Sequence, residues 1–321
     1  MSATPSEVEI AEEGPREGFQ IEKGPIPTAR KIELIDALSR TGLRSIQVVS
    51  FVNPKLVPGM ADAEAVVAGT ARTEGVSYRA LWLNERGFER ARACPGLDLK
   101  GTMSLSASET FLKRNQSRTI AQQIAASRRI VARYVELGLP LERATVMAAF
   151  GCNFEGDVPP ARVVELIGTA LDIAAEVGAP LQRVSLADTM AWATPSAVKR
   201  LLDAVWSKYP DLSMSLHLHD TRGMGIANAY AGLQMGVRHF DAAVAGLGGC
   251  PFAGHAGAAG NVCTEDLVFM CEEMGLSTGI GLEALIDCAR LAEDVVGHPL
   301  PGSVMKGGTL SRLRAAAAAP A

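Results

Sequence analysis

The chain has 321 residues, 48% of them hydrophobic, and a formal net charge of −4. This length and apolar content are sufficient for a large core in one or two domains. The slightly acidic balance, without long runs of one charge, does not predict a basic face for nucleic acid. No run of about 18 uninterrupted apolar residues occurs, so no membrane span is expected.

The cysteines and the N-terminal segment suggest a cellular compartment. Six cysteines occur without paired spacing, and residues 1–13 are acidic and polar. This segment has the features of neither a signal peptide nor an Arg-rich transit peptide. Reduced thiols and a cytoplasmic enzyme are therefore expected.

Apolar, β-branched segments alternate with helical patterns along the chain. The predicted strands are 8–11, 45–51, 77–83, 97–105, 143–149, 182–187, 212–219 and 240–244. The predicted helices are 27–41, 62–73, 85–93, 117–137, 160–177, 195–208, 226–235 and 265–274. Residues 14–24 are expected to form a loop, because glycine and proline interrupt them.

Strand–helix repeats of this kind over about 270 residues are typical of a (β/α)8 TIM barrel. A doubly wound open sheet is the competing architecture. It is less favoured, because Gly14 and Gly18 after the first strand lack dinucleotide-fingerprint spacing. The sequence predicts one α/β TIM-barrel catalytic domain in residues 1–300, followed by a short helical C-terminal tail in 301–321.

Two of the five histidines, His217 and His219, lie at the end of the seventh predicted strand. Side chains alternate between the faces of a strand, so both imidazoles point to one side and Leu216 and Leu218 to the other. Two imidazoles on one face form half of a metal site. The alternative is a pair of hydrogen-bonded polar residues in the core.

In a TIM barrel, reactive residues lie at the C-terminal ends of the strands and just beyond them. The candidate residues here lie within or just after strands one, two, six, seven and eight. They are Arg16, Glu17, Gln47, Asp188, His217, His219, Cys250 and Asn261. A carboxylate, two imidazoles and an amide suit Mg²⁺, Mn²⁺, Co²⁺ or Zn²⁺. A structural zinc site is less favoured, because no cysteine pair accompanies the histidines.

Residues 245–261 are rich in glycine and contain Cys250. Such a segment has little intrinsic rigidity. One interpretation is a loose surface connection. The other is a lid that brings the Cys250 thiol to the barrel mouth as an acid–base group. The spacing of the residues leaves both open.

Several motifs carry a family resemblance. EGPREGFQ at 13–20 resembles the E-x-G-x-R-[DE]-G-x-Q opening of the pyruvate-carboxyltransferase-like metal-dependent barrel enzymes. Within that group, four further motifs resemble the 3-hydroxy-3-methylglutaryl-CoA lyases. They are SFVNPK at 50–55, SLADT at 185–189, HLHDT at 217–221, and AGLGGCP at 245–251 followed by GN at 260–261. The similarity covers about residues 7–275.

The resemblance implies a divalent-metal-dependent lyase that cleaves a 3-hydroxyacyl-CoA into an acyl-CoA enolate and a keto acid. It implies that Mg²⁺ or Mn²⁺ is bound by Glu17, His217, His219 and Asn261. Arg16 would polarise the thioester carbonyl, Asp188 would lie near the substrate hydroxyl, and Cys250 would transfer a proton. Asn115 matches a position near the acyl-CoA.

The chain also departs from the lyase pattern. Glu17 stands where the lyases usually have Asp, and Gln47 where they usually have Glu, which removes a negative charge beside the site. Trp192 would narrow the acyl pocket. Arg222 replaces an aromatic residue and could bind a carboxylate, or it is a solvated residue at a helix start.

These departures predict a related branched or larger 3-hydroxyacyl-CoA as the substrate. One alternative is an aldolase or Claisen-type synthase that acts on 2-keto acids. Another is a homologue that binds acyl-CoA but turns over poorly. The sequence leaves the oligomeric state open, with a homodimer as one option.

Overall fold

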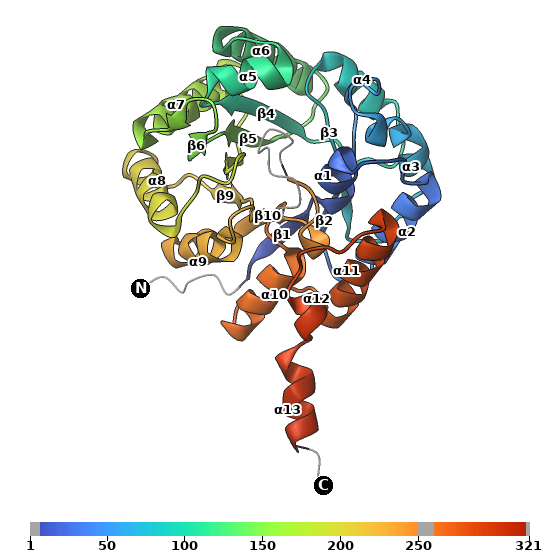
Figure 1. The fold of residues 1–321 in the computed structure, drawn as a ribbon. Helices are drawn as coiled ribbons and strands as arrows, with labels where there is room; N and C mark the ends of the chain where they lie inside the picture. Colours follow the sequence, from blue (N-terminus) through green and yellow to red (C-terminus); the bar gives the residue numbers. More distant parts are fainter. Residues whose placement is uncertain (1–6, 250–259, 319–321) are drawn as a thin grey trace.

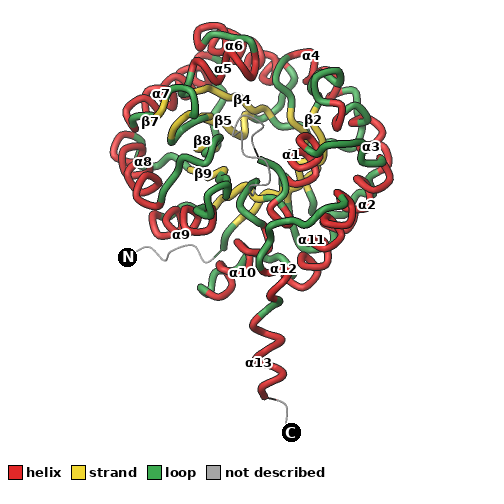
Figure 2. The backbone as a smooth tube through the Cα atoms, viewed as in Figure 1, coloured by secondary structure: helices red, strands yellow, loops and turns green. Residues whose placement is uncertain are grey.

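A computed structural model of the protein describes residues 7–249 and 260–318. Eight parallel strands curl around a common axis, with helices outside them (Figures 1 and 2). The strands are β1 (Glu9–Glu12), β2 (Ser45–Ser50), β3 (Ser77–Leu81), β4 (Gly101–Ser106), β5 (Leu141–Met147), β8 (Arg183–Ala187), β9 (Met214–His217) and β10 (His239–Ala242). Their order in the sheet, β3-β2-β1-β10-β9-β8-β5-β4, follows the chain around a ring. The predicted TIM barrel is confirmed.

The edge strands of this sheet, β3 and β4, meet at a seam that Asp98 bridges. The backbone N–H of Asp98 donates to the carbonyl oxygen of Tyr78 at 2.8 Å. The backbone N–H of Tyr78 donates to the Asp98 carboxylate at 2.7 Å. A cavity of about 430 Å³ opens at the seam, with Gln47 and Arg143 among its lining residues.

Helices follow the strands and cover their outer faces. The major ones are α2 (Thr28–Leu38), α3 (Ala63–Gly69), α4 (Glu85–Arg92), α6 (Ile120–Glu136), α7 (Pro160–Glu176), α8 (Pro195–Lys208), α9 (Gly225–Met235), α10 (Thr264–Glu273) and α11 (Leu282–Val296). Shorter elements are α1 (Gly14–Ile21), α5 (Glu109–Gln116), the 3₁₀ turns Pro58–Met60 and Val244–Gly246, and the antiparallel pair β6 (Gly151–Cys152) and β7 (Gly156–Asp157).

The expected loop at 14–24 is wrong in its first part, where the chain forms α1. Pro15 occupies the first turn, where its missing N–H costs no helical hydrogen bond. The backbone N–H of Gly14 donates to the buried Glu12 carboxylate at 2.7 Å, which fixes the start of the helix. The helix therefore begins directly after β1 and turns its first residues toward the barrel axis.

The C-terminal tail is helical, as predicted. Helix α12 (Val304–Gly307) packs against α10 and α11, and α13 (Leu310–Ala318) extends away from the barrel (Figure 1). Arg314 on α13 pairs with Glu273 at 2.8 Å. A domain boundary at residue 300 stays a prediction. Within the described ranges, no helix has the length and apolarity needed to cross a membrane.

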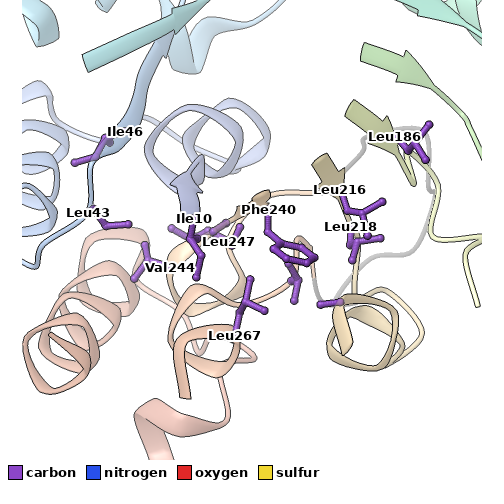
Figure 3. Packing of buried hydrophobic residues seen from close by; sticks show 14 of the residues in the cluster. Ile10, Leu43, Ile46, Leu186, Leu216, Leu218, Phe240, Val244, Leu247 and Leu267 are labelled. Atoms are coloured by element: carbon purple, nitrogen blue, oxygen red, sulfur yellow. The ribbon is translucent and has the colours of Figure 1, made fainter. Parts of the chain in front are cut away.

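The apolar core lies between the outer face of the strands and the surrounding helices (Figure 3). Leu216 and Leu218 on and after β9 are fully buried there. Gly232 on α9 admits Leu216, because a Cβ at position 232 would lie 2.5 Å from Leu216 Cδ1. The leucines thus pack outward, whereas His217 and His219, which alternate with them along the chain, turn inward, as the alternation predicts.

Leu216→Ala is expected to lower the free energy of unfolding by about 3 kcal/mol, because the vacated space beneath α9 cannot collapse fully. Leu56→Ala is the matched control and should change the free energy by less than about 0.5 kcal/mol, since Leu56 is 79% exposed. Chemical denaturation measures both. Equal effects of the two substitutions would contradict this packing.

Candidate active site

The strand register brings polar side chains together at one end of the barrel. His217 on β9 pairs with Ala187 on β8 and with Asp241 on β10. Asp188 directly follows β8, His219 lies two residues after β9, and Arg16 and Glu17 lie in α1 after β1. The candidate residues therefore meet at the C-terminal ends of neighbouring strands.

Glu17, His217 and His219 form a compact group of potential metal ligands. One ligand atom of each lies within 4.8 Å of the others. His219 Nε2 is 3.1 Å from Glu17 Oε1, and His217 Nε2 is 3.6 Å from Glu17 Oε2. The predicted pair of histidines thus faces the predicted carboxylate, and these donors suit a divalent cation.

Both histidine rings are oriented through their Nδ1 atoms. His219 Nδ1 lies 2.7 Å from the carbonyl oxygen of Asp188, to which it donates. His217 Nδ1 lies 3.2 Å from Asp241 Oδ2. In each ring, Nε2 is thereby left facing Glu17. Such a partner at the second ring nitrogen is the usual companion of a metal-ligating histidine, so these residues fit a bound metal.

Asn261 lies beside this group, as predicted. Its backbone forms an isolated antiparallel bridge with His219, and its side chain is buried. The amide nitrogen donates to the carbonyl oxygen of Leu247 at 3.1 Å, which leaves Oδ1 as the atom suited to a cation. Gly248 packs against the same group, because a Cβ there would lie 2.6 Å from Asn261 Nδ2 and 3.0 Å from Glu17 Cγ.

Burial and neighbouring charges set the protonation of this group. Burial opposes ionisation of Glu17, but Arg16 and the two histidines hold its pKa well below the usual range. Burial likewise lowers the pKa of His217, but Glu17 and Asp241 overcome this and raise it to about 10. Without a metal, His217 is therefore a protonated imidazolium paired with carboxylates at neutral pH.

Arg16 is held on several sides by polar groups. Its Nη1 is 2.9 Å from Glu17 Oε2, its Nε donates to Gln47 Oε1, and its Nη2 donates to Glu13 Oε2. The expected loss of negative charge beside the site through Gln47 is therefore offset by Glu13, whose side chain is 1% exposed. Glu13 was not predicted, although its position three residues before Arg16 would favour contact once α1 was recognised.

Two further residues were missed in the sequence. Arg143 on β5 donates to both oxygens of Asp241 at 2.8 Å, and its Nη2 lies 3.7 Å from Glu13 Oε1. Asp241 in turn contacts His217. In the sequence, each of these two residues could have been noticed only as a charged residue within an otherwise apolar predicted strand.

Asp188 anchors the loop that follows β8. Its Oδ1 accepts hydrogen bonds from the backbone N–H groups of Trp192 at 2.7 Å and Ala193 at 2.9 Å. Its Oδ2 is buried and has no hydrogen-bond partner within residues 7–249 and 260–318. Burial raises the pKa of Asp188. An unpaired buried carboxylate oxygen is suited to accept a proton or a hydrogen bond from a ligand.

The remaining candidates surround this centre. Trp192 Nε1 donates to Asn153 Oδ1 at 2.7 Å, and Arg222 Nη1 donates to the carbonyl oxygen of Ala191 at 3.0 Å. Asn115 is exposed near the end of α5. Substrate contacts of Trp192, Arg222 and Asn115 stay predictions. Cys250 lies outside the described residues.

The fold and this group define a TIM barrel with a candidate divalent-metal centre at the C-terminal ends of its strands. The sequence matches the family model described as HMGL-like over residues 7–292. The chain therefore belongs to the HMGL-like family.

Its relatives are carbon–carbon lyases. Hydroxymethylglutaryl-CoA lyase of Bacillus subtilis is 38% identical, over 92% of this chain and 96% of that protein. The mitochondrial hydroxymethylglutaryl-CoA lyase of Bos taurus is 39% identical, over 88% of this chain and 84% of that protein. Among solved structures, an HMG-CoA lyase from Acinetobacter baumannii in complex with coenzyme A and 3-methylmalate superposes with a TM-score of 0.86. Its sequence is 39% identical, and the match covers 96% of this chain and 97% of that chain. The predicted family and reaction class, a carbon–carbon lyase, are confirmed.

Metal binding is expected to release a proton from His217, because its raised pKa keeps it charged in the metal-free protein. Affinity for Mn²⁺ should therefore rise with pH, by about tenfold per unit between about pH 7 and 9. Titration calorimetry in buffers of different ionisation enthalpy should show about one proton released per ion. An affinity independent of pH in this range would contradict the assigned charge state.

Gly248→Ala should weaken Mn²⁺ binding by about tenfold or more, because the added methyl group would displace Glu17 and Asn261. Gly223→Ala is the matched control. Both glycines have positive φ, 90° and 69°, but a Cβ at 223 would meet nothing within 4 Å. Both variants therefore place a Cβ at a positive φ, and only the first should lose metal affinity. Equal metal affinity in the two variants would contradict this arrangement.

Proposed function

We propose that this protein cleaves 3-hydroxy-3-methylglutaryl-CoA, or a related 3-hydroxy-3-substituted acyl-CoA, to acetyl-CoA and a keto acid. The observation that carries the proposal is the guanidinium of Arg16, held 2.9 Å from the carboxylate of Glu17 in the candidate metal group. A fixed cation beside a metal site is suited to a substrate with a thioester oxygen and a hydroxyl. The coenzyme A in the Acinetobacter relative supports an acyl-CoA substrate.

The metal is proposed to be Mg²⁺ or Mn²⁺, held by Glu17, His217, His219 and Asn261, since oxygen donors with imidazole suit these ions. A divalent cation in this place would supply Lewis-acid polarisation of substrate oxygens.

The chain's own residues have separate roles in the proposed reaction. Arg16 donates hydrogen bonds to the thioester oxygen, where negative charge develops as the carbon–carbon bond breaks and the enolate forms. The buried Asp188 accepts the substrate hydroxyl proton at its unpaired Oδ2, which its raised pKa favours. Protonation of the enolate carbon by Cys250 is a proposal from the sequence resemblance.

Substrate selection is proposed to involve the loop after β8. Trp192 is fixed by Asp188 and Asn153, and its ring lies against Gly151, where a Cβ would approach it to 2.6 Å. We propose that the fixed indole gives the acyl pocket a different shape from that of lyases with small residues at this position. A cytoplasmic location and a homodimer stay predictions, and the named relatives include bacterial and mitochondrial enzymes.

Purified protein with Mg²⁺ or Mn²⁺ is expected to release acetyl-CoA from at least one member of a panel of 3-hydroxyacyl-CoAs that includes 3-hydroxy-3-methylglutaryl-CoA. Arg16→Met should lower kcat by about 10²-fold or more, because the charge on the enolate would lose its donor. The control Arg128→Met should leave kcat unchanged, since Arg128 is 47% exposed and pairs with Glu176.

A coupled assay for acetyl-CoA and the keto product measures these rates. Condensation of 2-keto acids with acetyl-CoA, without cleavage of any 3-hydroxyacyl-CoA, would contradict the proposal and favour a synthase.

A further inference from the structure

Arg16 has two carboxylate partners among the described residues, and they differ in kind. Glu17 belongs to the metal group, whereas Glu13 does not contact either histidine of that group in the described interactions. The remaining partner, Gln47, is a neutral amide that accepts from Arg16 Nε. Glu13 is therefore the counterion of Arg16 that stays available when a cation occupies Glu17.

We infer that Glu13 is a positioning residue for Arg16: its carboxylate anchors the guanidinium, so that Arg16 keeps its orientation toward the substrate when a cation takes the Glu17 carboxylate. The inference rests on the proposed role of Arg16. It gives Glu13 a function in the reaction although its carboxylate touches neither the proposed metal group nor the reacting atoms.

The backbone around Glu13 makes it a rigid support. Its N–H donates to the carbonyl oxygen of Ala242 on β10 at 2.8 Å. Its carbonyl oxygen accepts from the N–H of Glu17 at 2.8 Å and from that of Arg16 at 3.1 Å. The residue thus joins the barrel wall to the first turn of α1, and its side chain reaches Arg16 from a fixed origin.

Burial makes this contact strong. The Glu13 side chain is 1% exposed and that of Arg16 is 11% exposed, so water screens their attraction weakly. A charge-assisted hydrogen bond of this kind fixes orientation as well as charge. Without Glu13, Glu17 would be the one carboxylate partner of the guanidinium among the described residues, and Arg16 would compete with the cation for that carboxylate.

Glu13 also connects Arg16 to the other half of the site. Its Oε1 makes no hydrogen bond within the described residues and lies 3.7 Å from Arg143 Nη2. Arg143 holds Asp241, which orients His217. Arginines and carboxylates therefore alternate along a line of contacts that starts at Arg16 and ends at the proposed metal ligand His217. In this line, Glu13 lies between Arg16 and Arg143.

The first test is kinetic. Glu13→Gln keeps the shape and removes the charge, and kcat is expected to fall at least about tenfold while KM stays within about threefold. Adding Gln47→Glu places a carboxylate at Nε of the same guanidinium, and this double variant should recover kcat to within about threefold of the wild type. A residue needed only for folding would not be rescued in this way.

Glu142→Gln is the matched control, because Glu142 is a partly buried carboxylate that pairs with Arg79 and Lys100 and not with Arg16. It should keep the wild-type kcat. All variants should bind one Mn²⁺ per chain, which shows that they are folded. A wild-type kcat in Glu13→Gln, or a double variant no faster than Glu13→Gln, would overturn the inference.

A second measurement is independent of turnover. In a crystal structure of Glu13→Val, the Arg16 guanidinium should rotate away from its contact with Gln47, and an unmoved Arg16 would overturn the inference. If the wild type cleaves no 3-hydroxyacyl-CoA, the proposed function fails, and this structure still decides the role of Glu13.

Discussion

The buried carboxylate of Glu17 is the constraint on which the site depends. A carboxylate withdrawn from water is stable in its ionised form only if positive charge faces it. Arg16 and His217 supply that charge and His219 adds a hydrogen bond, and these residues come from a helix after β1 and from the end of β9. The closely packed Gly248 leaves the space that this cluster needs. A divalent cation would replace the imidazolium proton of His217 as positive charge beside Glu17. Metal binding would therefore be coupled to proton release.

The residues that differ from the lyase pattern are adjusted to one another. Gln47 supplies an acceptor to Arg16 Nε without a charge, and the charge comes instead from Glu13 at Nη2 of the same guanidinium. The longer side chain of Glu17 still reaches both histidines, at 3.1 and 3.6 Å. With these substitutions, the site therefore still has ligands for a metal and partners that orient Arg16. The loop after β8, with Trp192, is where the differences bear on the substrate.

Local patterns predicted the parts of the molecule that depend on local physics. The alternation of Leu216, His217, Leu218 and His219 placed the imidazoles inside the barrel, and helix 195–208 was predicted at its observed bounds. Helix α1 was missed because Gly14 and Pro15 suggested a loop, and the bond from Gly14 to Glu12 that stabilises its start depends on the fold. The contact between Arg143 and Asp241 joins residues 98 positions apart, so no local pattern contains it.

The central claim is that Glu17, His217, His219 and Asn261 together hold one divalent cation. The most direct measurement is anomalous diffraction from crystals grown with Mn²⁺, which locates the ion without reference to activity. The account predicts one strong peak within coordination distance of these four side chains, with the Nδ1 contacts of both histidines retained. A peak at Cys263, Glu265 and Asp266, the other described group with metal-ligand spacing, and none at Glu17 would contradict it.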